Sequence, residues 1–152
     1  MPYEKRPSGG IIIEASTVLT ANWLGPWLEI NGVTGDITLP GASPSKVDIL
    51  THRDVLTYGG FGQNGAGIAE VTDLAFDLLC DPMDSTFLSL IADMSSRAAR
   101  DYRITFPPGG VTPVTTKWGV RGQVGMTNRG PLKGYLMSSV TVLANVIKFN
   151  VA

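Results

Sequence analysis

Two long segments near the end of the chain, residues 115–126 and 135–150, alternate apolar and polar side chains. In the first, one face carries the apolar residues Trp118, Val120, Val124 and Met126. This period of two is typical of strands with one buried face in an antiparallel sheet. In the second segment, residues 140–149 are apolar on both faces, which favours burial of part of the second face against a neighbouring molecule. The pair therefore predicts a sheet that closes with two long antiparallel strands.

Further strands are predicted between dispersed turn residues. The 152-residue chain holds 18 glycines and 10 prolines, spread between apolar stretches as expected for many turns in one domain. Residues 11–24 predict one or two short strands, residues 46–50 another after a break at 40–45, and residues 74–78 a half-buried strand. Asn31-Gly32 lies between two strand-like runs, and this dipeptide predicts a tight hairpin.

One helix is predicted within residues 81–99. Asp81 can cap it, Pro82 suits its first turn, and Asp84 places negative charge near the positive end of the helix dipole. The expected apolar stripe comprises Met83, Phe87, Leu90, Ile91, Met94 and Ala98. Arg97 and Arg100 are expected at a solvated C-terminal end.

Two segments lack strand or helix patterns. Residues 1–10 mix charge, proline and glycine, which is typical of an arm that orders against a partner. Residues 51–67 predict a long glycine-rich loop. Gly60, Gly62 and Gly65 in that loop have the spacing of a dinucleotide-binding motif, but a strand pattern follows, whereas the motif needs a helix to hold the pyrophosphate. The glycines therefore favour a flexible or interface-forming loop.

Charge and reactive residues argue against several function classes. Lys and Arg total 12 against 13 Asp and Glu, so tight binding of nucleic acid is not expected. One cysteine, Cys80, and one histidine, His52, are too few for a zinc site, and no nucleophile elbow accompanies His52. The acids Asp81 and Asp84 are explained by helix capping. We expect no enzymatic activity, no cofactor or metal, and no membrane segment or signal peptide.

The order of segments from residue 27 to 150 resembles the major tail tube protein of long, flexible-tailed (siphovirus) bacteriophages. The matching motifs are Gly32-Val33-Thr34, Pro40-Gly41, Val47-Asp48, Thr51, and the junction from Phe76 to Thr86 with its Asp81, Pro82 and Asp84. Residues 1–26 have no match to the pattern. The resemblance implies an antiparallel β-sandwich or partly closed barrel with one flanking α-helix, forming a single tail-tube domain over residues 1–152.

The resemblance further implies hexameric rings that stack into a hollow conduit for ejection of double-stranded viral DNA. Partners would be copies of the chain and other tail proteins, namely the tape measure, terminator and tip. The virion tail would be its location, with assembly in the host cytoplasm. Subunit or ring contacts are expected at Tyr58, Phe61, Gln63, Asn64, Ile11, Ile12 and Ile13. The polar residues of the first long strand, Lys117, Arg121 and Gln123, are expected on a solvent or lumen face.

Other functions remain open at this stage. A second virion component on a similar sandwich, such as a tail terminator or a capsid decoration protein, would share the same pattern. A carbohydrate-binding module would instead need exposed aromatic side chains, for which Trp23, Trp27 and Trp118 are the candidates. Trp118 shares a face with Val120 and Val124, which favours a place in the core.

Overall fold

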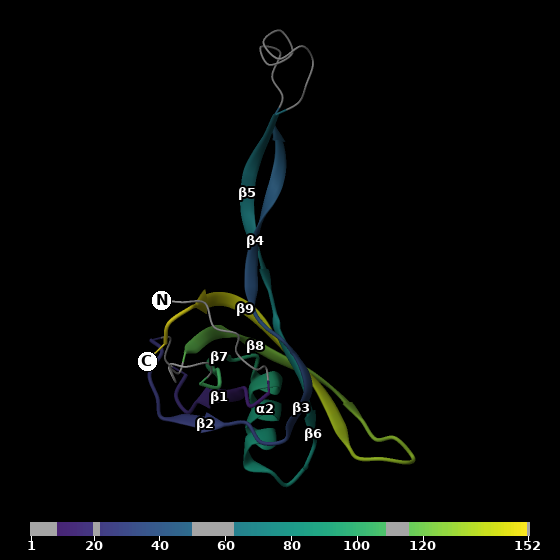
Figure 1. Ribbon diagram of the computed structural model, residues 1–152. Coiled ribbons are helices and arrows are strands. Elements are labelled where there is room, and N and C mark those ends of the chain that lie inside the picture. Colours follow the sequence, from purple (N-terminus) through teal and green to yellow (C-terminus); the bar gives the residue numbers. More distant parts are fainter. Residues whose placement is uncertain (1–8, 20–21, 50–62, 109–115, 152) are drawn as a thin grey trace. The chain divides into compact units, whose positions relative to one another are not determined.

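The computed structural model describes residues 9–19, 22–49, 63–108 and 116–151 (Figure 1). The chain divides into two compact units, one formed by residues 1–40 with 73–152 and the other by residues 41–72. The expectation of a single domain over residues 1–152 stays a prediction.

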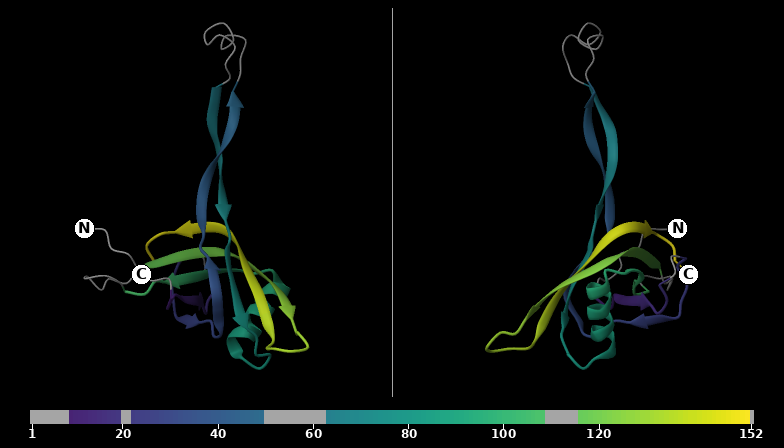
Figure 2. Two further views of the ribbon diagram at one scale, coloured as in Figure 1. Left: turned by 45° about the vertical axis from the view of Figure 1, so that its right-hand side comes forward. Right: turned by 180° about the vertical axis from the view of Figure 1, so that it is seen from behind.

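The first unit is one curled antiparallel sheet with a helix packed inside its curl (Figures 1 and 2). The order of its seven strands is β2-β1-β7-β8-β9-β6-β3. The elements are β1 (Ile12–Ser16), β2 (Trp27–Glu29), β3 (Val33–Thr38), β6 (Leu74–Leu79), α2 (Ser85–Ser96), β7 (Ala99–Thr105), β8 (Lys117–Arg129) and β9 (Met137–Lys148). The predicted mainly β, partly closed barrel with a flanking helix is confirmed.

The core fills the concave side of this sheet. Leu74, Phe76 and Leu78 of β6 are buried, and the alternating residues Asp73, Ala75 and Asp77 are only partly so, which confirms the predicted strand. The helix contributes Phe87 and Leu90, while the other strands contribute Ile13, Tyr102, Ile104, Val120, Val124, Val140 and Val142. Burial of this apolar set on one face is what closes the sheet around the helix.

The two long strands predicted at the C-terminal end are confirmed as β8 and β9, which pair along most of their length. Their register shifts between Arg121 and Gly122. A Cβ atom on Gly122 would lie 1.8 Å from the carbonyl oxygen of Leu143, so this close approach of two backbones requires glycine.

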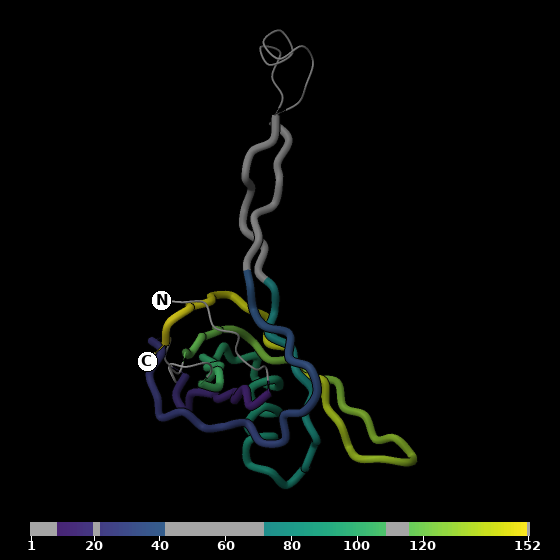
Figure 3. Tube along the Cα trace, in the orientation of Figure 1, coloured from purple at the N-terminus to yellow at the C-terminus, as the bar shows by residue number. Residues whose placement is uncertain are grey.

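The predicted hairpin at Asn31-Gly32 is wrong in its pairing, although the turn itself is present. β2 pairs with β1 and β3 with β6, so the two strands lie at opposite edges of the sheet. The amide of Ile30 donates to the carbonyl of Ile13 in β1, and the carbonyl of Gly32 accepts from the amide of Leu79 in β6. Residues 30–32 therefore hydrogen-bond first to β1 and then to β6. Figure 3 shows this part of the chain crossing the open side of the curl.

The helix begins later than predicted. Asp84, not Asp81, is its N-cap, and the Asp84 carboxylate accepts from the amide of Phe87 at 3.2 Å. Asp81 instead accepts from the amide of Met83 in the turn before the helix, and this leaves Met83 85% exposed rather than on the apolar stripe. The helix ends at Arg97, which has a left-handed backbone (φ 55°), so Ala98 lies beyond it.

The second unit is a two-stranded antiparallel sheet of β4 (Gly41–Ile49) and β5 (Gln63–Thr72). The strand predicted from residue 46 already begins at Gly41, so the predicted break at 40–45 is wrong. A register shift between Pro44 and Lys46 accommodates the proline within the ladder. Residues 63–67 of the predicted loop belong to β5, and residues 50–62 lie outside the described residues.

Candidate assembly surfaces

The residues predicted from the resemblance to make ring contacts are only partly within the described chain. Tyr58 and Phe61 lie outside it, as do residues 1–8 of the N-terminal arm. Gln63 and Asn64 open β5, where they pair with Ile49 and Asp48 of β4. Their contacts with other subunits stay predictions.

The three isoleucines that open β1 do not form one exposed surface. Ile13 is 1% exposed and belongs to the core, and Ile11 packs partly buried against that core. Ile12 is 38% exposed. Of the three, Ile12 is therefore the side chain available to a neighbouring molecule.

Arg121 is not a free cation on a solvent or lumen face. Its Nε lies 2.7 Å from Oδ1 of Asp101, a carboxylate whose side chain is 1% exposed. Oδ2 of the same carboxylate accepts from the backbone amide of Trp23 at 3.0 Å, and the Trp23 ring covers the Arg121 guanidinium at 4.6 Å. The outer faces of β7 and β8 therefore hold a neutralised pair under an aromatic cover. On the same strand, Gln123 is exposed and Lys117 is partly buried.

A second set of the same kind lies on β1 and β7. Arg103 Nη2 lies 2.7 Å from Oε2 of Glu14, Thr105 donates to Oε1 of Glu14 at 2.8 Å, and the Trp27 ring covers Arg103 at 4.7 Å. Burial raises the pKa of Glu14, but the hydrogen bonds from Arg103 and Thr105 outweigh burial and hold the pKa below its ordinary value. Residues 22–27, here called the tryptophan strap, thus pack over two ion pairs.

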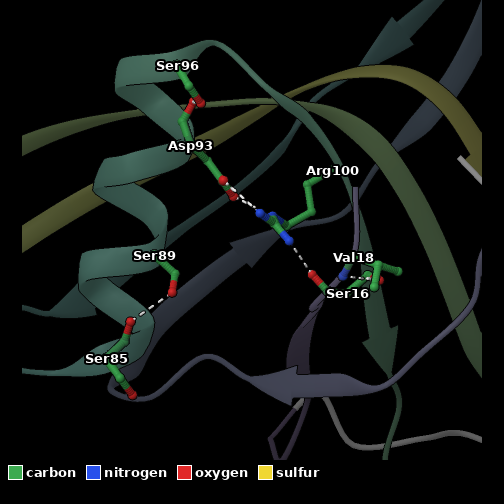
Figure 4. Close-up of polar contacts among 7 residues, drawn as sticks. All are labelled: Ser16, Val18, Ser85, Ser89, Asp93, Ser96 and Arg100. Carbon is green, nitrogen blue, oxygen red and sulfur yellow. Dashed lines mark hydrogen bonds and ion pairs between the residues drawn. The ribbon is translucent and has the colours of Figure 1, made fainter. Parts of the chain in front are cut away.

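A third ion pair joins the helix to the sheet (Figure 4). Arg100 bonds both carboxylate oxygens of Asp93, Nε to Oδ2 at 2.5 Å and Nη2 to Oδ1 at 2.9 Å, and its Nη1 donates to the carbonyl of Ser16 at 2.6 Å. The hydrogen bonds to Asp93 raise the pKa of Arg100 above its ordinary value. Arg100 was expected at a solvated helix end together with Arg97. It is instead a largely buried residue of β7, because the chain reverses at Arg97, which is exposed.

The cleft beside this pair does not offer a reaction centre. It has a volume of about 180 Å³ and lies between the helix and the edge formed by β1 and β2. Both oxygens of its carboxylate, Asp93, are already bonded to Arg100. Among the described residues no group of three or more metal-ligating side chains occurs, and no described helix is long and apolar enough to span a membrane. His52 lies outside the described residues.

Apolar side chains reach the surface at the turn between β8 and β9. Residues 128–136, here called the β8–β9 tip, are all exposed, and Leu132 and Tyr135 are 102% and 78% exposed. A cleft of about 290 Å³ lies between the base of this tip and the helix, lined by Cys80, Phe87, Ile91 and Leu136 among others. No contact was expected at residues 128–136 from the sequence; the available signal was two large apolar residues, Leu132 and Tyr135, among Gly130, Pro131 and Gly134.

The outer face of β9 forms another apolar surface. Leu143 and Val146 are 54% and 42% exposed. Burial of part of this second face against a neighbouring molecule stays a prediction. Contiguous surfaces of this kind mark contact sites between proteins more often than isolated exposed leucines do.

The three tryptophans do not form the open aromatic platform that a carbohydrate-binding module would need. Trp23 and Trp27 stack on arginines, as described above. Trp118 makes edge-to-face contacts with Phe106 and Phe149, with ring centroids 4.7 and 4.9 Å apart. Each tryptophan is partly buried against its partners.

Neither a scan against protein-family models nor a search of the curated proteins gives a match. Solved structures do match over nearly the whole chain. A chain of the PVC sheath/tube terminator in its extended state, from an extracellular contractile injection system, has a TM-score of 0.65 at 11% identity, covering 95% of this chain and 96% of that chain. A chain of the tube-terminating cap of the anti-feeding prophage has a TM-score of 0.65 at 9% identity, covering 100% and 95%.

A third match is a chain of the six-fold symmetrised baseplate of the anti-feeding prophage, with a TM-score of 0.62 at 8% identity, covering 99% of this chain and 97% of that chain. At these identities the likeness concerns the fold. The first of these chains comes from a contractile injection system, so the comparison supports the fold and does not support the flexible-tailed class specifically. The chain shares the fold of these terminator, baseplate and cap chains.

Proposed function

We propose that this chain is a structural subunit of a tail-like particle, and that it assembles into hexameric rings that stack into a hollow tube. The observation that carries the proposal is the likeness of the fold over 95% or more of both chains to parts of tube terminator, cap and baseplate assemblies. One of these assemblies is six-fold symmetrised, which supports a six-membered ring.

The surface chemistry of the first unit fits a subunit better than a free monomer. Leu132, Tyr135 and Leu143 are more than half exposed. Subunits that repeat one head-to-tail contact bury such surfaces in every copy and close into rings when the rotation allows it. The proposed role requires no catalysis and no cofactor.

We also propose that the tube conducts double-stranded DNA, as the resemblance to phage tail tubes implies. A conduit must not retain a polyanion, and each exposed cation that neutralises a phosphate strengthens binding. Three arginines, Arg100, Arg103 and Arg121, are each paired with a carboxylate. The chain as a whole carries a formal charge of −1. Other tail proteins, such as a tape measure and a tip, would complete the particle in the virion tail after assembly in the host cytoplasm.

A tail terminator is the second candidate. It is favoured by the matches to a sheath/tube terminator and to a tube-terminating cap. A terminator would form one ring on a tube made of another protein, whereas a tube subunit stacks many rings of itself. The length of the assembly therefore distinguishes a tube subunit from a terminator.

The experiment is negative-stain electron microscopy of the purified protein over a concentration series, with light scattering to report mass. Hollow tubes of variable length, with mass rising with concentration, are expected for the tube subunit. Single rings of constant mass would favour the terminator. Protein that stays monomeric at every concentration, and also when seeded with preformed tail-tip complexes, would contradict both functions.

A further inference from the structure

The β8–β9 tip carries positive charge as well as exposed apolar side chains. Arg129 and Lys133 are both exposed. The ion pairs found among the described residues use other cations, namely Arg100, Arg103 and Arg121. Figures 1 and 2 show the turn between β8 and β9 projecting beyond the curled sheet and the helix. The tip is therefore a cationic and apolar projection.

Its base is held firmly enough to present this projection in one direction. The buried hydroxyl of Ser138 donates to Oδ1 of Asn128 at 2.6 Å, across the two strands that carry the tip. The amide of Cys80 donates to the carbonyl of Leu136 at 2.9 Å, which ties the tip to the end of β6. A projection anchored by hydrogen bonds on two sides loses less conformational entropy when it binds a partner.

The outer face of β3, β6 and β9 has the opposite charge. Asp36 of β3 is exposed and Asp77 of β6 is partly exposed. Asp77 lies close to the backbone just before Asp36, because an ideal Cβ on Gly35 would lie 4.0 Å from Oδ2 of Asp77. The ion pairs among the described residues involve other carboxylates.

The same face also offers an apolar contact. In the register of β6 and β9, Leu74 pairs with Val142 and Asp77 with Ser139. Leu74 and Val142 point into the core, so Leu143 and Asp77 point outward together. Leu143, 54% exposed, gives this face an apolar side chain on β9, four residues along the strand from Ser139, the register partner of Asp77.

From this complementarity we infer that the β8–β9 tip of one copy of the chain docks on the outer face of β3, β6 and β9 of a second copy. Arg129 and Lys133 face Asp36 and Asp77 of the second copy, and Leu132 and Tyr135 contact the area around Leu143. Tip and face are different surfaces of the same chain, so the contact is head-to-tail and repeats from copy to copy. The inference rests on the proposed function, since it assigns the contact that joins neighbouring subunits.

Charge reversal tests the inference in the full chain. Arg129→Glu with Lys133→Glu, or Asp36→Lys with Asp77→Lys, should raise the concentration needed for assembly about tenfold or more, because like charges then face each other. The chain with all four changes should assemble within about threefold of the original concentration, since the charges are complementary again. Arg97→Glu is the matched control for Arg129→Glu, because Arg97 is an exposed arginine at the end of the helix, outside both the tip and the docking face, and it should leave assembly unchanged.

Cross-linking gives a readout that does not depend on tube formation. In a Cys80→Ser background, one chain carrying Lys133→Cys is mixed with another carrying Asp36→Cys and oxidised at high protein concentration. The inference predicts a mixed disulfide-linked dimer in several-fold excess over either dimer of like chains. Circular dichroism of each variant checks that the sheet has folded.

The outcomes separate this contact from the proposed function. Tubes that form equally well from every charge variant would overturn the docking contact and leave the tube function standing. Failure of the original chain to form rings or tubes, together with preferential mixed cross-linking, would overturn the function and keep the contact between copies. Cross-links no more frequent between tip and face than between like chains would overturn the docking contact in either case.

Discussion

Gly119 lies directly beneath the Trp23 ring of the tryptophan strap. A Cβ atom at this position would lie 2.6 Å from a ring carbon of Trp23 and 2.6 Å from a methyl group of Val151. Gly119→Ala should therefore displace the Trp23 ring from Arg121 and lower the free energy of unfolding by about 1–3 kcal/mol, the usual cost of overpacking. Urea unfolding followed by tryptophan fluorescence measures both effects.

Gly125 provides the control for that change, because it lies on the same strand and a Cβ there would meet nothing within 4 Å. Gly125→Ala should leave stability unchanged or slightly raised, since alanine restricts the unfolded chain more than glycine does. Equal destabilisation by both substitutions would show that β8 is sensitive to any side chain and that the strap has no special packing at Gly119.

Glu14 makes stability depend on pH in the acid range. Its pKa is lower in the folded protein than the ordinary value of 4.5, so its stabilising effect is complete above that value. The effect is lost as the pH falls through the lowered pKa, because protonation then releases Arg103 and Thr105. Glu14→Gln should lower the free energy of unfolding at pH 7 by about 1.5–3 kcal/mol, the usual value of hydrogen bonds to charged groups.

Urea unfolding of both proteins between pH 7 and pH 3 measures this dependence. The curves of the original protein and of Glu14→Gln should converge toward the acid end, because both then carry a neutral side chain at this position. Parallel curves over the whole range would mean that the Glu14 carboxylate contributes equally when it is protonated, and would contradict the assigned role.

At the scale of elements, the ion pair between Asp93 and Arg100 fixes the helix against β1 and β7. The side chains are 8% and 15% exposed, so removal of the guanidinium leaves a nearly buried carboxylate without its partner. Arg100→Met should cost about 3–5 kcal/mol in the free energy of unfolding. Arg97→Met, an exposed change three residues earlier, should cost less than about 1 kcal/mol. Thermal and urea unfolding of the two variants provide the comparison.

Sequence patterns predicted three of the strands but not the different environments of Arg97 and Arg100. Alternation identified β6, β8 and β9, because a period of two depends only on which residues face the core. Nothing local distinguishes Arg100 from Arg97, since the difference arises from the chain reversal at Arg97 and from the position of Ser16, far away in the sequence.

The pairing of the strands could not be predicted from local sequence patterns either. Asn31-Gly32 correctly predicted a turn with positive φ at glycine (φ +81°), but not that its flanking strands belong to opposite sheet edges. That arrangement depends on the curl of the whole sheet around the helix. The capping residue was missed for a related reason: both Asp81 and Asp84 precede the helix, and only Asp84 also accepts from Asn31 on the crossing segment.

At the scale of the whole molecule, we expect the first unit to fold without the second unit, residues 41–72. The seven-stranded sheet contains neither β4 nor β5, and Thr38 of β3 is the register partner of Ala75 of β6. The antiparallel strands β3 and β6 could therefore be joined after Pro40 and before Asp73 by a short turn such as Asn-Gly. Replacement of residues 41–72 by that turn should leave a protein that folds cooperatively, with a midpoint of thermal unfolding within about 5 °C of the original.

The same deletion should prevent tube growth if residues 41–72 carry contacts between subunits or rings, as the resemblance to tail tubes implies for residues 51–67. Electron microscopy is expected to find rings or monomers of the shortened chain where the full chain forms tubes. A Gly/Ser segment of equal length in place of residues 41–72 controls for chain length, and it should fail in the same way. Normal tubes from the shortened chain would place all assembly contacts on the first unit, and would leave the β8–β9 tip and the outer face of β3, β6 and β9 as the surfaces on which growth depends.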